Sequence, residues 1–210
     1  MSQHQPFFSF IALIGPAAIG TRIILRDRIL QQTVIRLSQE DSLTGLSNRR
    51  RIKELLENEI QRTNRYNTVF SVILVDIDHF KAVNDQFGHQ VGDKVLTKIA
   101  EIIRSSVRAT DLAGRWGGEE FVIISPGTDI DGGFSLAEKV RARLESTDLG
   151  EIGHRTASFG VTVFADGDGI DEIIARADIG LYKAKQWGRN RVEKAPALIK
   201  TEPSSFAPVR

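Results

Sequence analysis

The stretch Arg115-Trp-Gly-Gly-Glu-Glu-Phe121 decides how this chain folds. It is followed by an apolar run, Phe121-Val-Ile-Ile-Ser125, and preceded by a mixed segment that begins at Asp111. Two short runs joined by a glycine pair predict a β-hairpin, because glycine adopts positive φ without steric cost. Two adjacent carboxylates, Glu119 and Glu120, then lie just past the turn. Alone, this pattern is most simply a solvated hairpin tip.

A second acidic strand end changes that interpretation. The apolar run from Val69 to Val75 has the length of a strand and favours a central position, covered on both faces. It stops at Asp76-Ile-Asp78. If the hairpin strand pairs with it, Asp76 and Glu119 converge and offer the hard oxygen ligands that suit Mg²⁺ or Mn²⁺. Asp78 is assigned instead to capping a one-turn helix that follows it.

Length and composition fit one domain with extensions. The chain has 210 residues, of which 41% are hydrophobic and 26% charged, as in globular proteins. A net charge of +1 argues against a nucleic-acid partner, because phosphate binding needs a basic excess. The lack of cysteine excludes disulfides, zinc–thiolate sites and thiol catalysis, and it fits a reducing compartment.

The N-terminal residues 1–25 are a hydrophobic segment and a possible membrane anchor. Residues 7–25 carry no charge before Arg22, and a span needs about 20 apolar residues. Arg22, Arg26 and Arg28 follow the apolar run, so the positive-inside rule places the rest of the chain in the cytoplasm. The alternatives are a buried or fraying helix, or the stub of a larger membrane region.

Two further extensions flank the central domain. Residues 26–40 predict a helical linker, and the seven-residue spacing of Ile23, Leu30 and Leu37 is typical of a short coiled-coil stalk. An ordinary amphipathic helix explains the same spacing. Residues 195–210 contain three prolines and little apolar periodicity, which predicts a disordered tail.

Between these extensions, the pattern predicts helix, strand, helix, hairpin, helix, strand, helix and short strand. Ser47 and Asp131 are expected helix caps, and residues 85–93 are expected to form a loop. Ala157 to Val163 alternates as a strand does. The last helix should end at Gly188, with residues 189–192 as an edge strand. This order predicts an α+β fold in which helices cover a sheet.

Several polar side chains near these elements suit a nucleotide. Lys81, Lys185 and Arg189 are candidates for contacts with phosphate oxygens. Asn84 and Asp93 can together read a guanine edge, since an amide donates and accepts while a carboxylate accepts. Each of these residues alone is more often an ordinary surface group.

Five segments together resemble one family, the GGDEF domains of bacterial diguanylate cyclases. They are Asp41-Ser-Leu-Thr-Gly-Leu-Ser-Asn-Arg-Arg50, Asp76-Ile-Asp-His-Phe-Lys81, Asn84-Asp-Gln-Phe-Gly-His-Gln-Val-Gly-Asp93, Arg115-Trp-Gly-Gly-Glu-Glu-Phe121 and Ala184-Lys-Gln-Trp-Gly-Arg-Asn190. Their order and spacing match the family, which makes the resemblance specific to residues 41–194, the expected catalytic domain. Glu119 stands where the family's name has Asp, a common variant in active members.

The resemblance implies a palm-like, ferredoxin-like α+β fold related to adenylyl cyclases, with a mostly antiparallel central sheet. It implies condensation of two GTP into cyclic di-GMP with release of two pyrophosphates, using Mg²⁺ (or Mn²⁺). Each domain of the family holds one GTP, so a homodimer completes the reaction. It further implies a role in biofilm formation. Together with the possible N-terminal anchor, it predicts the bacterial inner membrane with the catalytic domain in the cytoplasm, and without that anchor a cytoplasmic protein.

Site residues follow from the resemblance position by position. Asp76, the carbonyl of Ile77 and Glu119 match metal ligands, and Glu119 also matches the proton acceptor for the 3′-hydroxyl. That second role is the weaker one, because a metal-bound carboxylate is a poor base. Matches to substrate-binding positions are Phe80, Lys81, Asn84, His89, Asp93, Gly117, Gly118, Lys185 and Arg189.

One more motif, Arg108-Ala-Thr-Asp111, matches the family's inhibitory site, where an arginine and a carboxylate hold cyclic di-GMP. As a bare pattern it is equally a surface salt bridge. Two other functions stay open: a non-catalytic module of the same fold that binds GTP or cyclic di-GMP, and a membrane-tethered scaffold. An unbroken set of metal and glycine motifs favours the enzyme.

Overall fold

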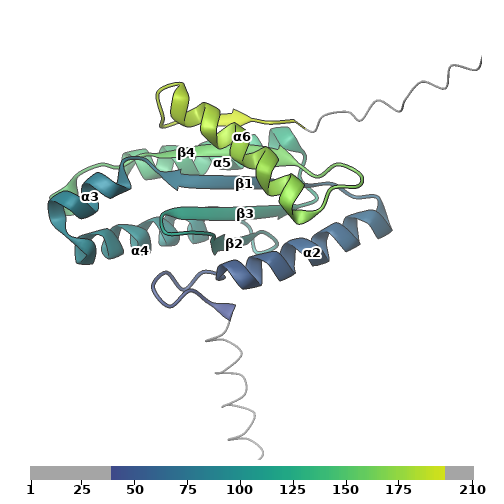
Figure 1. Cartoon of the computed structure of the whole chain (residues 1–210), viewed down its shortest axis with the longest axis horizontal. Coiled ribbons are helices and arrows are strands. Elements are labelled where there is room, and N and C mark those ends of the chain that lie inside the picture. The colour runs from purple at the N-terminus through teal and green to yellow at the C-terminus, as the bar shows by residue number, and fades with distance from the viewer. Residues whose placement is uncertain (1–38, 197–210) are drawn as a thin grey trace, which may run out of the picture. The chain divides into compact units, whose positions relative to one another are not determined.

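The computed structural model describes residues 39–196 (Figure 1). The possible anchor, residues 1–25, lies outside this range, as do nearly all of the predicted stalk, 26–40, and tail, 195–210. None of the helices in the described range has the length and apolar character that a membrane crossing requires. Contacts divide the chain into residues 1–40 and 41–210, and the second unit holds the fold described below.

This unit is an α+β domain, as predicted. Its elements, in chain order, are α2 (Arg49–Tyr66), β1 (Phe70–Ile77), α3 (Phe80–Phe87), α4 (His89–Ser106), β2 (Leu112–Arg115), β3 (Glu120–Pro126), α5 (Ile130–Ser146), the short 3-10 helix η1 (Gly150–Ile152), β4 (Ala157–Val163), α6 (Ile170–Gln186) and β5 (Val192–Lys194).

The five strands form one mixed sheet in the order β2-β3-β1-β4-β5. All neighbours are antiparallel except β4 and β5. Strand β1 is central, and all eight of its residues are buried, which confirms the expectation from its apolar run. Near the C-terminal end of β1, Asp76 lies opposite Glu120 on β3 and opposite Ser158 on β4. The two acidic strand ends therefore meet.

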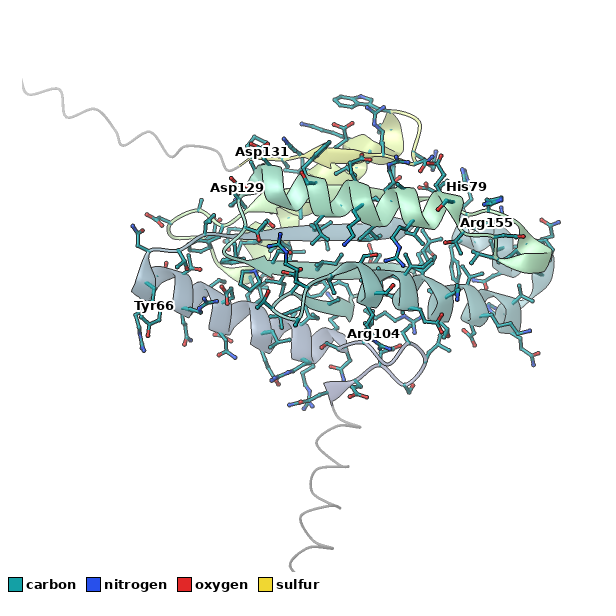
Figure 2. All side chains as sticks on the ribbon, turned by 180° about the vertical axis from the view of Figure 1, so that it is seen from behind. Tyr66, His79, Arg104, Asp129, Asp131 and Arg155 are labelled. Atoms are coloured by element: carbon teal, nitrogen blue, oxygen red, sulfur yellow. The ribbon has the colours of Figure 1, made fainter. Side chains whose placement is uncertain are left out.

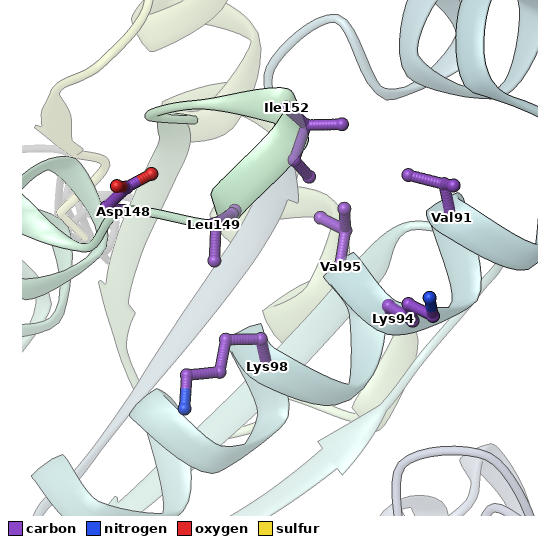
Figure 3. A pocket seen from close by; sticks show the side chains of 7 residues that line it. All are labelled: Val91, Lys94, Val95, Lys98, Asp148, Leu149 and Ile152. Atoms are coloured by element: carbon purple, nitrogen blue, oxygen red, sulfur yellow. The ribbon is translucent and has the colours of Figure 1, made fainter.

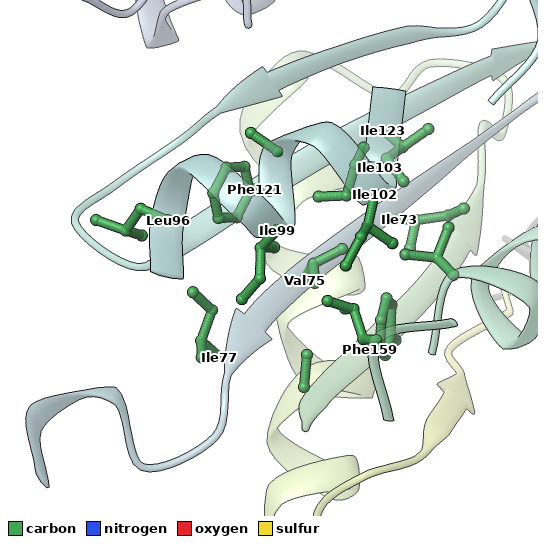
Figure 4. Packing of buried hydrophobic residues seen from close by; sticks show 14 of the residues in the cluster. Ile73, Val75, Ile77, Leu96, Ile99, Ile102, Ile103, Phe121, Ile123 and Phe159 are labelled. Atoms are coloured by element: carbon green, nitrogen blue, oxygen red, sulfur yellow. The ribbon is translucent and has the colours of Figure 1, made fainter. Parts of the chain in front are cut away.

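The sheet separates two cores. Odd-numbered residues of β1, such as Ile73 and Val75, pack with Phe121 and Phe159 against α4 and α5 (Figure 4). Even-numbered residues, such as Val72, belong to the core shared with α2 and α6. Since side chains alternate along a strand, Asp76 extends the even row and points toward α6.

The acidic strand ends lie at one end of the sheet. Figure 2 shows His79, which follows β1, and Arg155, which precedes β4, at one end of the domain. Tyr66 and Asp129, which flank the other ends of β1 and β3, lie at the opposite end. We call the first of these the acidic end, and it holds the candidate site.

Both predicted helix caps were wrong by one or two residues. The side chain of Asn48, not Ser47, accepts from the Arg51 N–H at the start of α2. Ser47 is instead bridged to Gly114 of β2, which takes it out of the helix. At α5 the cap is Asp129, which accepts from Gly132, and Asp131 lies in the first turn.

The predicted loop at residues 85–93 is almost entirely helical. Helix α3 runs to Phe87 and α4 starts at His89, so Gly88 alone separates them. Gly88 has φ 82°, a left-handed conformation that glycine adopts without strain. One glycine therefore turns the chain, and the polar residues around it are positioned by two helix ends instead of a loop.

The C-terminal end of the domain also differs from the prediction. Helix α6 ends at Gln186, and Arg189 and Asn190 adopt left-handed conformations, so the edge strand starts only at Val192. Ala195 is 5% exposed and its N–H donates to Val161, so the fold extends one residue past the predicted boundary at 194.

Close contact between α6 and β4 depends on Gly160. A Cβ on this residue would lie 2.1 Å from the Ala177 carbonyl oxygen and 2.3 Å from the Leu181 nitrogen, both backbone atoms. Gly160→Ala should therefore destabilise the domain by about 3 kcal/mol, because the helix must move away from the strand. Urea denaturation followed by circular dichroism measures this. Gly118→Ala, where a Cβ meets nothing within 4 Å, is the control, and an equal loss in both variants would contradict the packing argument.

Candidate active site

The acidic end is built around an ion pair between Asp76 and Lys185. Asp76 lies one residue before the end of β1, and its side chain is 8% exposed. Lys185 comes from the last turn of α6, and its Nζ lies 2.8 Å from Asp76 Oδ2. Two of the residues predicted from the sequence, one as a metal ligand and one as a phosphate contact, are thus in direct contact.

Negative charge accumulates around this pair. Burial raises the pKa of Asp76 and outweighs the opposing effects of Lys185 and Arg189, while Asp78 raises the same pKa further. Burial and the charge of Asp76 also raise the pKa of Glu119 and of Glu120. Three carboxyl groups therefore share a region where their ionised forms are disfavoured. A bound cation would offset their mutual repulsion and favour the ionised forms.

The hairpin turn confirms one prediction and corrects another. Strands β2 and β3 are joined by residues 116–119, as the glycine pair indicated. However, neither Gly117 nor Gly118 has positive φ. The turn is closed instead by the Glu120 carbonyl oxygen, which accepts from the backbone N–H groups of Trp116 and Gly117.

The surroundings of Gly117 and Gly118 favour glycine for different reasons. A Cβ on Gly117 would lie 2.4 Å from Glu120 Oε2, so this residue makes room for the neighbouring carboxylate. A Cβ on Gly118 would meet nothing within 4 Å. The space beside Gly118 is therefore open, as a turn that receives a ligand requires.

An arginine that was not among the predicted site residues fixes the turn. The Nη2 of Arg115 donates to the Gly118 carbonyl oxygen at 2.7 Å, and its Nη1 lies 3.3 Å from both carboxylate oxygens of Asp41. Burial acts to raise the pKa of Asp41, but hydrogen bonds from Thr44 and the charge of Arg115 hold it below its usual value. Both residues belong to the quoted motifs, but only the fold shows that they touch.

The metal-ligand set predicted from the sequence is brought together in part. The Ile77 N–H donates to the Glu119 carbonyl oxygen at 3.4 Å, so the backbones of the two acidic segments are adjacent. No cluster of three or more His, Cys, Asp or Glu side chains suited to a metal occurs within residues 39–196. The predicted set consists of two carboxylates and one backbone carbonyl, so it is not a cluster of this kind. Its oxygen donors and their excess negative charge nevertheless fit Mg²⁺.

The predicted guanine-reading residues come from α3 and α4. A Cβ on Gly92 would lie 2.0 Å from Asn84 Oδ1, so α3 and α4 approach closely at this point. Phe80 lies beside them, but it is only 5% exposed and belongs to the core. Lys81, His89 and Asp93 are exposed at the same helix pair.

The capping role predicted for Asp78 was wrong. Helix α3 starts after His79, which has φ 58°, and no side chain caps it. Asp78 is 3% exposed, and its carboxylate accepts from Thr156 Oγ1 and Ser158 Oγ on the β4 side, each at 2.7 Å. It also accepts from the Asn190 N–H at 3.0 Å. Pairing with β4, which the sequence pattern does not reveal, turns this side chain away from the helix.

The predicted inhibitory motif lines a cavity of about 260 Å³. Arg108 and Asp111 stand on its wall, where the Arg108 N–H donates to Asp111 Oδ2 at 2.8 Å. Lys139 of α5 lines the same cavity, and its Nζ donates to the Ser106 carbonyl oxygen. Sequence spacing did not suggest Lys139, because it is 28 residues from Asp111 and only the packing of α5 brings it near.

A second cavity, of about 420 Å³, lies between α4 and the segment from Asp148 to Ile152 (Figure 3). Its floor is apolar, and Lys94 and Lys98 stand on its rim. None of the residues predicted to bind metal, GTP or cyclic di-GMP lines it. The size of this cavity therefore does not mark it as the active site. The candidate active site is assigned to the acidic end, because the carboxylates lie there.

Comparison with known proteins agrees with this geometry. The sequence profile described as "Diguanylate cyclase, GGDEF domain" matches residues 38–191. The chain is 42% identical over 158 residues to the diguanylate cyclase DgcP of Pseudomonas aeruginosa, covering 74% of this chain and 24% of that protein. This chain therefore belongs to the GGDEF family of diguanylate cyclases.

Solved structures show the same fold. The coiled coil and GGDEF domain of DgcB from Caulobacter crescentus, in complex with c-di-GMP, aligns with a TM-score of 0.83 at 31% identity. That alignment covers 88% of this chain and all of the other. The active GGEEF domain of a diguanylate cyclase from Vibrio cholerae aligns at 0.69 and 38% identity, covering 73% of this chain and 99% of that one.

The raised pKa of Glu119 predicts a pH-dependent stability. A carboxyl group whose pKa is higher in the folded state disfavours folding once it ionises, so this cost grows as pH rises above its usual value of 4.5. Without divalent ions, Glu119→Gln should therefore raise Tm near neutral pH, and the gain should vanish as the pH falls toward about 4. Thermal unfolding across this range measures it.

The matched control is Glu57→Gln, an exposed position on α2. It should leave Tm nearly unchanged across the same pH range. A Tm that falls at neutral pH in the Glu119 variant would mean that this carboxylate is favourably paired in the fold, which would contradict the charge accumulation described above.

Proposed function

We propose that this chain is an active diguanylate cyclase, which condenses two GTP into cyclic di-GMP and releases two pyrophosphates. One observation carries the proposal: antiparallel pairing of β1 with β3 brings Asp76 beside the Glu119–Glu120 pair, with Lys185 in contact with Asp76. The residues proposed to hold a cation and a phosphate are thus adjacent. Because the chain spans 24% of the length of DgcP, activity of the chain itself is what the experiments below test.

The metal would be held by Asp76, the Ile77 carbonyl and Glu119. Bound Mg²⁺ would supply charge neutralisation on the phosphates and a lower pKa for the attacking 3′-hydroxyl. The protein side chains have distinct tasks around it. Lys185 now neutralises Asp76, and in the nucleotide complex its ammonium would turn to a phosphate oxygen, assisted by Arg189. Glu119 would act mainly as a metal ligand, and accepting the hydroxyl proton would be its weaker role, because a metal-bound carboxylate is a poor base.

The base would bind between α3 and α4. Asn84 is held close to Gly92, where its amide can both donate to and accept from guanine, and Asp93 can accept from the guanine N–H groups. Phe80 is buried, so its proposed role is to shape the wall beside Asn84. Lys81 and His89 are exposed at the same helix ends and would contact the rest of the nucleotide.

The reaction would need a homodimer. One domain offers one proposed set of metal ligands, where the Ile77 and Glu119 backbones meet, and one proposed set of guanine-reading residues on α3 and α4. It would therefore hold a single GTP, whereas the product contains two guanylyl units. Two copies facing each other would let each 3′-hydroxyl reach the α-phosphate of the other nucleotide. Residues 1–25 and 26–40, predicted above as anchor and stalk, would bring the copies together.

Activity is tested first. The full chain, freed of nucleotide and incubated with GTP and Mg²⁺, should form cyclic di-GMP detectable by chromatography. The rate should rise faster than linearly with protein concentration, because two chains assemble one site. Glu119→Gln should lower the rate by at least about a hundredfold, since it removes a metal ligand and the proton acceptor.

A linear dependence on protein concentration would mean that the full chain is already a stable dimer. One result would argue against the function itself. Binding of GTP without product at any concentration would favour the alternative, a non-catalytic module that binds GTP or cyclic di-GMP.

Product inhibition is the second part of the proposal. Arg108, Asp111 and Lys139 line one cavity and offer two cationic side chains and a carboxylate to a dianionic ligand. The relative DgcB was solved in complex with c-di-GMP. Arg108→Ala should raise the concentration of added cyclic di-GMP that halves the activity by about tenfold, because a charge-assisted hydrogen bond is lost. Its uninhibited rate should stay at the wild-type value.

Steady-state rates at increasing product concentration measure this shift. Arg65→Ala, an exposed arginine in the last turn of α2, is the matched control and should leave inhibition unchanged. Equal inhibition of the Arg108 variant and the wild type would refute the inhibitory role of this cavity.

A further inference from the structure

A buried carboxylate next to the metal-ligand position has no role in the function proposed so far. Asp78 is 3% exposed and accepts three hydrogen bonds. Its Oδ2 accepts from Thr156 Oγ1 and from the Asn190 N–H, while its Oδ1 accepts from Ser158 Oγ. Such extensive pairing satisfies the hydrogen-bonding capacity of a polar group that is buried in the protein.

The same pairing argues against Asp78 as a metal ligand. A carboxylate oxygen has two lone pairs, so Oδ2 is fully used by Thr156 and Asn190. Oδ1 accepts from Ser158 alone, but the residue is 3% exposed, which leaves little access for a metal ion with its bound water. Asp76, two residues earlier, lies in a different environment, because within residues 39–196 its carboxylate pairs with Lys185 and with no comparable set of hydroxyl and amide donors. The two aspartates of this motif are therefore in different chemical situations.

The bond from Asn190 to Asp78 holds an unusual turn. Arg189 and Asn190 have φ values of 63° and 45°, and neither is glycine. Consecutive non-glycine residues in this region cost energy and persist only where the surrounding structure imposes them. The Arg189 N–H donates to the Ala184 carbonyl oxygen, which anchors the turn to α6.

Helix α5 holds the same turn from the other side. Asn190 Oδ1 accepts from Arg141 at 3.0 Å, and Asn190 Nδ2 donates to Glu145 at 2.8 Å. Asn190 is thus bonded through its backbone to the end of β1 and through its side chain to α5. Its neighbour Arg189 carries the cationic side chain that acts on Asp76.

We propose that Asp78 is a positioning residue, which holds the Arg189–Asn190 turn and through it directs the Arg189 guanidinium toward the phosphates of bound GTP. The inference rests on the proposed function for the identity of the ligand. Asp78 itself would contact none of the reacting atoms, and it would act on them only through Arg189.

The test compares Asp78→Asn with wild type in the full chain. Asparagine keeps the shape but offers one acceptor oxygen where three donors converge. We expect the KM for GTP to rise about tenfold, the effect of losing one charge-assisted contact, with kcat changed by less than about threefold. In the Arg189→Ala background, the same substitution should have no further effect on KM, since interacting residues give non-additive losses.

A matched control separates positioning from general stability. Asp168 is also a buried carboxylate that holds a loop, accepting from the Ala165 N–H at 2.8 Å and from Arg176 at 2.6 Å, but it lies beyond the far end of β4. Asp168→Asn should lower Tm by about as much as Asp78→Asn does, and it should leave the KM for GTP at the wild-type value. If Asp78→Asn does not fold, a second turn variant, Thr156→Val, removes one of the donors that fix the Asp78 carboxylate beneath the turn. It should raise the KM for GTP by a smaller factor and show the same dependence on Arg189.

Three results would overturn the inference. They are a tenfold effect that persists in the Arg189→Ala background, an unchanged KM in both turn variants, and a rise in the Mg²⁺ concentration needed for half-maximal rate at an unchanged KM for GTP. If wild type forms no product, the proposed function fails instead. Equilibrium dialysis of GTP then replaces KM, and the same non-additivity with Arg189 still decides the positioning role.

Discussion

The register between β1 and β3 is the constraint on which the rest of this domain depends. Asp76 stands opposite Glu120, and the backbone N–H of Ile77 reaches Glu119. A slip of one residue would move every side chain of β1 to the other face of the sheet. It would bury the acidic side chain among α4 and α5 and expose the apolar row to Lys185. Both cores therefore enforce the pairing that assembles the site.

The acidic end holds more negative charge than its single direct cation pair offsets. Burial and mutual repulsion raise the pKa values of Asp76, Glu119 and Glu120, while Lys185 opposes them only in part. This cost of folding is acceptable because a divalent cation and a polyphosphate, arriving together, would pair with the carboxylates and with Lys185 respectively. Asp78, close to the same site, is instead surrounded by hydrogen-bond donors from Thr156, Ser158 and Asn190.

Much of this fold was predictable because apolar patterns report burial directly. The all-apolar run of β1, the alternation of Ala157 to Val163 and the stripes of the long helices all correspond to observed elements. The errors arose where a polar residue had several possible partners. Ser47 and Asp78 were both interpreted as local caps, but each is bonded to a segment distant in sequence. Local propensity carries no information on such partners.

By itself, the sequence determined the strands, the helices and the residue types gathered at the acidic end, because spacing and composition are local properties. Only the tertiary structure decided which of those residues touch. Tertiary packing placed Lys185 on Asp76, joined Arg115 of the hairpin to Asp41, and set Asp78 under the Arg189–Asn190 turn. These contacts join residues up to 112 positions apart, and only the packed sheet and helices bring such residues within hydrogen-bonding distance.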